Sequence, residues 1–144
     1  MKSKRKKQAA LVFLAVLAVA VILRLAFPWD RQSRVTRTVT RHQELLMQDI
    51  EKGNFTRSAR LLTVRSVHPN PYLIEYRCGA SGFGSATSYY GFYYAPDGAM
   101  DQLWCAGTPL IPQGNGWLYE EKNGDNRYYT EEITDGFYYY EASF

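Results

Sequence analysis

The two cysteines are the residues of this 144-residue chain whose chemistry depends most on where the fold places them. Cys78 and Cys105 each end a segment of alternating side chains, in phase with apolar positions such as Ile74 and Leu103. Outside the cytoplasm a disulfide is chemically allowed, and closing a loop of this length would stabilise by roughly 3 to 4 kcal/mol. We therefore predict a disulfide between Cys78 and Cys105, with two buried free thiols as the alternative.

Other residues with catalytic or metal-binding chemistry are sparse. His42 and His68 have no cysteine or carboxylate at ligand spacing, so we expect no metal and no cofactor. The glycine-rich run at residues 79–84 leads into a strand and lacks the lysine of a phosphate-binding loop, so it is expected to be a flexible connection or a bulge. Paired acids such as Glu120 and Glu132 leave one enzymatic alternative open, an envelope hydrolase with a general acid and a general base.

Aromatic side chains are present in excess, with 12 Tyr, 7 Phe and 3 Trp. Along residues 89–94 alternate rings face opposite sides of a strand, so one set can fill a core under a helix while the other remains at a surface. One interpretation is that the tyrosines simply pair across strands. The functional interpretation is an aromatic platform, rimmed by acids, that stacks on a sugar or captures a peptide. Its candidate residues are Tyr89, Tyr93, Tyr128, Tyr138 and Tyr140.

The elements that would position these residues begin with a helix. Val35, Val39, Leu46 and Ile50 recur at helical spacing, which predicts an amphipathic helix from about residue 33 to residue 52. Gly53 and the asparagine after it form a strong C-terminal stop. The start is less well defined, because a capping pair at Thr40 and Gln43 would also allow a later beginning.

Beyond the helix the period of the apolar residues changes to two, which indicates strands. The turn signals between them are mostly those of hairpins, including Asn123-Gly124 and Asp135-Gly136. The pattern predicts an α+β fold in which the helix packs on an antiparallel sheet of about seven short strands, with a cystatin-like arrangement as one solution. The predicted strands cover residues 62–65, 72–78, 89–94, 100–105, 117–121, 127–133 and 137–141.

The N-terminal sequence indicates a membrane anchor. Residues 2–7 hold five cations, and residues 9–23 follow without a polar side chain. At about 1.5 Å per residue, an apolar helix over residues 9–29 would just cross a ~30 Å hydrocarbon core, with Arg24 close enough to its outer end to reach the headgroups. A cleavable signal peptide is the alternative, since residues 18–20 fit a small-x-small cleavage pattern.

Charge divides the rest of the chain into a basic stalk and an acidic head. Residues 30–65 carry eight cations and four acids, whereas residues 66–144 carry three cations and ten acids. The dense basic cluster before the apolar run favours a cytoplasmic N-terminus and an extracellular C-terminal domain. Since the basic stretch has no aromatic platforms, we expect no nucleic-acid partner. The predicted organisation is a basic segment at 1–8, a transmembrane helix at 9–29, a stalk and helix at 30–54 and a Tyr-rich sheet domain at 55–144.

Three segments support a resemblance to known sequences: residues 82–97, with the run from Ser88 to Asp97, then residues 124–131 and residues 137–141. Through these motifs the chain resembles a family of small, uncharacterised, single-pass membrane-anchored proteins of Gram-positive bacteria. The resemblance implies a shared fold and topology and carries no functional residues. Together with the anchor, it leads us to expect a membrane-tethered extracytoplasmic binding module whose partners are the membrane and an envelope glycan or peptide.

Overall fold

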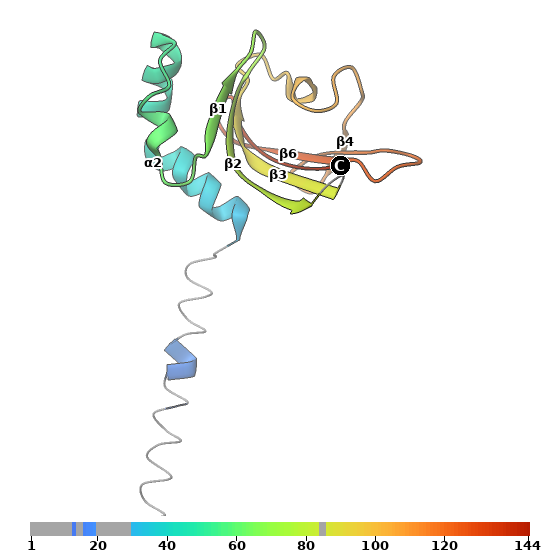
Figure 1. Cartoon of the computed structure of the whole chain (residues 1–144), viewed down its shortest axis with the longest axis horizontal. Coiled ribbons are helices and arrows are strands. Elements are labelled where there is room, and N and C mark those ends of the chain that lie inside the picture. Colours follow the sequence, from blue (N-terminus) through green and yellow to red (C-terminus); the bar gives the residue numbers. More distant parts are fainter. Residues whose placement is uncertain (1–12, 14–15, 20–29, 84–85) are drawn as a thin grey trace, which may run out of the picture.

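The computed structural model describes residues 13, 16–19, 30–83 and 86–144. It confirms an α+β fold with a single antiparallel sheet and one long helix packed on it (Figure 1). None of the helices in the described ranges is long and apolar enough to cross a bilayer. Most of the transmembrane helix predicted at residues 9–29 lies outside the described residues, which include only 13 and 16–19 of it.

Helix α2 (Arg31–Lys52) is close to its predicted bounds. It begins two residues early because the carboxylate of Asp30 accepts the N–H of Ser33 at 2.9 Å and caps the first turn. It ends where Gly53 adopts a left-handed φ of 60° and donates its N–H to the carbonyls of Asp49 and Ile50. His42 has non-helical angles inside the helix, so the late capping pair seen in the sequence marks a kink rather than a start.

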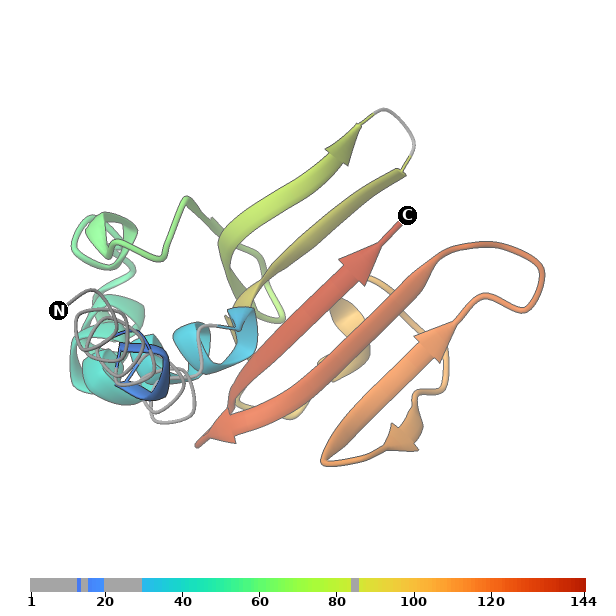
Figure 2. The same cartoon turned by 90° about the horizontal axis from the view of Figure 1, so that it is seen from below.

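Seven strands form the sheet in the order β1-β2-β3-β7-β6-β5-β4, and every neighbouring pair is antiparallel (Figure 2). The turn with Asp135 and Gly136, both at positive φ, joins the last two strands as predicted. The strands are β1 (Ser66–Pro69), β2 (Ile74–Phe83), β3 (Ala86–Tyr94), β4 (Ile111–Gln113), β5 (Gly116–Glu120), β6 (Arg127–Thr134) and β7 (Phe137–Ser143).

Two predicted strands are wrong. Residues 62–65 form a turn in which Val64 N–H donates to the carbonyl of Leu61, and the first strand starts at Ser66 instead. Residues 100–105 begin with the 3₁₀ helix η2 (Met100–Gln102), and the N–H of Cys105 reaches back to Asp101. The alternation in the sequence is not matched by burial in either segment, since Leu62 is 97% exposed while Val64 is buried, and residues 100–104 are all half-buried.

The glycine-rich segment is also more ordered than expected, because β2 continues through it to Phe83 and pairs with β3. Gly79 is needed there, since a side chain would meet the ring of Tyr90 at 2.5 Å. A register shift falls between Arg77 and Gly79, just before the run in which a flexible connection or a bulge was predicted.

Side chains fill a core on each face of the sheet. On the helix face, the buried residues of α2 pack on rings from the central strands, with Phe92 stacked on Tyr76 at 4.6 Å between ring centroids. The opposite face is covered by residues 95–110, the crossover from β3 to the far edge of the sheet (Figure 1). We call residues 95–110 the covering segment. It decides which predicted site residues reach solvent.

Candidate functional site

The tyrosines predicted to form a platform lie on the face under the covering segment. Tyr93, Tyr128, Tyr138 and Tyr140 are at most 7% exposed, and Tyr89 is half-buried against Trp104 at 5.6 Å between ring centroids. The hydroxyl of Tyr128 donates to the carbonyl of Met100 in the covering segment. The expected exposure of this set is therefore wrong, because both ring sets are core. Binding by these tyrosines stays a prediction that would require the covering segment to move.

The predicted disulfide is wrong, and the alternative of two buried free thiols is confirmed. Cys78 belongs to the core on the helix face and Cys105 to the core on the opposite face, so the sheet lies between them. Burial raises the pKa of Cys78 to about 12 and that of Cys105 to about 11. Both thiols are thus protonated at neutral pH and are poor nucleophiles.

The acid pair considered for hydrolysis does not converge. Glu120 lies opposite Arg127, with 3.3 Å between carboxylate and guanidinium, whereas Glu132 lies five residues further along β6. At about 3.4 Å per residue this separates the two acids by roughly 17 Å, and the odd spacing directs them to opposite faces. A general acid and base flanking one bond need to be within about 10 Å of each other.

A buried charged cluster that the sequence did not reveal lies beneath the covering segment. Glu75 is 5% exposed, receives two 3.1 Å hydrogen bonds from Arg77 and accepts the hydroxyl of Tyr140. The Arg77 guanidinium lies 4.8 Å from the ring centroid of Tyr89, which adds a cation–π contact. Because the members satisfy one another, we interpret this cluster as structural.

The structure also forms a basic groove between α2 and the turn that follows η1 (Ser58–Arg60). Two adjoining hollows of about 160 and 70 Å³ share Arg34 and Thr63, and we call them together the α2 groove. Among the described residues, no aspartate or glutamate lines either hollow. The lining residues of the α2 groove are Arg34, Val35, Arg37, Thr38, Arg41, His42, Leu62, Thr63, Arg65, Cys78 and Tyr90.

Three of the cations in the α2 groove are positioned by the helix backbone and not by ion pairs with acids. The spacing of Arg34, Arg37 and Arg41 places them along one face of α2. None of the ion pairs found in the described part of the chain involves these three or Arg65. The hydroxyl of Thr63 donates to that of Thr38 at 3.0 Å and fixes the turn against the helix. The positive charge of the stalk was the only sign of this groove in the sequence. The position of the turn at Thr63 beside α2 could not be predicted from it.

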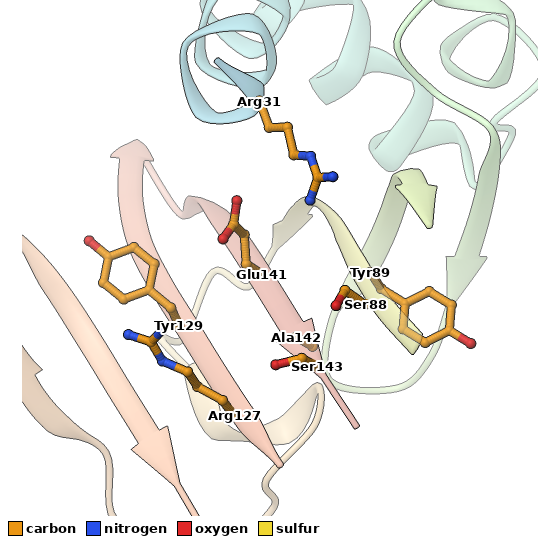
Figure 3. Close-up of a pocket in the computed structure, with 8 residues that line it drawn as sticks. All are labelled: Arg31, Ser88, Tyr89, Arg127, Tyr129, Glu141, Ala142 and Ser143. Atoms are coloured by element: carbon orange, nitrogen blue, oxygen red, sulfur yellow. The ribbon is translucent and has the colours of Figure 1, made fainter. Parts of the chain in front are cut away.

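A second, more mixed hollow of about 100 Å³ lies where the sheet extends past the first turn of α2 (Figure 3). Arg31 and Glu141 point toward each other across it, and Ser88 and Ser143 lie on its floor. Glu141 accepts the hydroxyl of Tyr139, and Arg127 is paired with Glu120. With its charges already engaged, this hollow is a weaker candidate than the α2 groove.

No group of three metal-ligating side chains is found within the described ranges. No family model, curated protein or solved structure matches the chain. The likeness to membrane-anchored proteins of Gram-positive bacteria and the cystatin-like arrangement therefore stay predictions.

Proposed function

We propose that the chain is a membrane-tethered extracytoplasmic binding module that holds phosphate groups of an envelope glycan in the α2 groove. The observation that carries this proposal is the lining of the groove, in which four arginines and a histidine converge with no acid among them. An envelope hydrolase is less well supported, since its acid pair does not converge.

Guanidinium groups favour phosphate for geometric reasons. Each presents a planar fork of N–H donors that bonds two phosphate oxygens at once. The acidic residues elsewhere on the domain would repel an anion. An anion is therefore expected to bind in the α2 groove rather than on the rest of the surface.

The predicted tether would hold the groove close to a bilayer. Residue 31 starts α2 directly after the apolar segment, and Arg41 lies ten residues further along. At about 1.5 Å per residue, the groove would lie within roughly 15 Å of the start of the helix. Phosphate could therefore come from a glycan polymer or from lipid headgroups, and the test must separate these two sources.

Binding is tested with the full chain in a non-ionic detergent, titrated with a soluble glycerol-phosphate polymer and, separately, with phosphatidylglycerol vesicles. Replacing Arg37 by glutamine is expected to weaken polymer binding by about tenfold, since a hydrogen bond to a charged group contributes about 1.5 kcal/mol or more. The affinity should also fall as salt is raised.

The matched control is Arg60→Gln, which removes one positive charge from an exposed residue outside the groove. Equal losses for Arg37→Gln and Arg60→Gln would show that binding follows net charge and would contradict the groove. Binding to vesicles but not to the polymer would assign the phosphate to lipid.

The tether makes a separate prediction about topology. The chain is expected to fractionate with membranes, and protease added to intact cells should degrade the C-terminal domain, because the basic N-terminal cluster stays in the cytoplasm. A chain lacking residues 1–29 provides the control and should leave the membrane fraction. A soluble mature form beginning at residue 21 would establish the signal peptide instead, and protection from protease would reverse the orientation.

A further inference from the structure

The outer edge of β2 is open along half of its length. β1 pairs with β2 only from Ile74 to Arg77, while β2 continues to Phe83 (Figure 2). Residues 80–83 are exposed, and the stretch from Gly79 to Phe83 contains no charge and no proline. Such an edge is a template for pairing with another strand.

The open part of β6, residues 131–134, carries Glu131 and Glu132, and the two outermost strands of the sheet carry proline. β1 ends with Pro69, and the three-residue strand β4 has Pro112 at its centre. A proline cannot donate to a ladder, and short edge strands offer few groups to pair. The distal part of β2 differs from all three, so it is the edge of this sheet that is suited to pairing.

Hydrogen bonds to β7 show which backbone groups of β2 face outward. Thr87 lies opposite Gly82. It donates its N–H to the carbonyl of Phe144 and accepts the N–H of Phe144, on the side of β3 away from β2. In the alternation of an antiparallel ladder, the pair formed by Gly82 and Thr87 then falls at a non-hydrogen-bonded position, which places the backbone of Gly82, at a positive φ of 115°, on the open edge. Ala80 lies opposite Tyr89, two residues before Gly82. Because backbone direction repeats every two residues along a strand, the backbone of Ala80 also lies on the open edge.

We propose that this edge pairs with the same edge of a second copy of the chain, antiparallel and centred on Ser81. In that register Ala80 of each copy bonds Gly82 of the other, and both residues are outward-facing. An uncharged segment meets itself without like-charge repulsion, and its small side chains allow close approach of two symmetric edges.

The exposed hydrophobic residues beside the edge support self-pairing. Phe83 is 96% exposed and Leu62 is 97% exposed. The proposed register sets Phe83 opposite Gly79 of the second copy, next to the smaller hollow of the α2 groove, whereas Arg37 and Arg41 line the larger hollow. Each Phe83 would thus leave water by packing beside Leu62 of the other copy.

Covalent trapping tests the register directly. In the full chain, Ser81→Cys is expected to form a disulfide-linked dimer on mild oxidation, because the two copies of residue 81 face each other across the symmetry axis. The two native thiols are buried and should contribute little. The control, Asn123→Cys, places a thiol on the exposed turn between β5 and β6 and should give only background crosslinking.

Sedimentation of the full chain in density-matched non-ionic detergent tests the interface without a new thiol. The parent is expected to show a concentration-dependent monomer–dimer equilibrium, which Ala80→Pro and Phe83→Ser both shift to monomer. Ile111→Ser changes an exposed apolar residue at the opposite edge and should leave the equilibrium unchanged. A parent that stays monomeric, a dimer that tolerates Phe83→Ser, or equal crosslinking by the two introduced cysteines would each overturn the proposal.

Discussion

Raising the pH from about 10 to about 12 is expected to unfold the domain in one cooperative step, because unfolded tyrosines lose their protons near pH 10 and the buried ones do not. Burial raises the pKa of Tyr76, Tyr93 and Tyr128. Burial also raises the pKa of Tyr139 and Tyr140, and the carboxylates of Glu141 and Glu75 add to the shift. All five of these side chains are at most 1% exposed.

The direction follows from proton binding. Above pH 10 the folded chain holds protons that the unfolded chain has released, so the free energy of unfolding falls as the pH rises. Each buried tyrosine contributes about 1.4 kcal/mol per pH unit, and five together contribute about 7 kcal/mol per unit. Since domains of this size are stable by about 5 to 15 kcal/mol, one to two pH units should suffice.

The measurement follows tyrosinate absorbance and far-ultraviolet circular dichroism through the same titration. The part of the tyrosinate signal that comes from the five buried rings should appear together with the loss of the sheet signal, because the buried hydroxyls ionise only on unfolding. More tyrosinate signal than the other seven tyrosines can supply, appearing while the sheet signal is intact, would show that the five buried rings are accessible to water in the native state. It would also favour a covering segment that opens.

The sequence was sufficient wherever a local signal fixed the backbone. α2 ends as predicted because Gly53 takes the left-handed conformation, and the last hairpin turns at Asp135 and Gly136 for the same reason. The antiparallel sheet followed from the period of two in strands such as β6 and β7.

The exposure of the tyrosines and the disulfide were mispredicted for one reason, the covering segment. The alternation at residues 100–105 predicted a strand, and nothing in the sequence of residues 95–110 indicates that they cross the sheet and bury Tyr93 and Tyr140. The same crossing puts Cys105 on the face opposite Cys78. The α2 groove was missed for a related reason, since it needs the turn at Thr63 to lie beside α2.

The second large effect is expected from Phe92→Ala, which should destabilise the domain by about 3 to 5 kcal/mol. Phe92 lies on the central strand β3, fully buried, with its ring stacked on Tyr76 and 6.4 Å from that of Phe137 between centroids. These neighbours are held by the sheet backbone and by α2, so they cannot collapse into the space left by the ring.

Phe83→Ala makes the same chemical change at the other end of the β2–β3 hairpin, where the ring is 96% exposed. Measured by urea unfolding at a concentration that keeps the chain monomeric, Phe83→Ala is expected to shift the free energy of unfolding by less than about 0.5 kcal/mol. The contrast isolates burial, because residue type and hairpin are the same in both variants. Similar losses at the two positions would mean that the β2–β3 arm packs against something at Phe83, and a loss under about 1 kcal/mol at Phe92 would mean that the helix-face core is loosely packed.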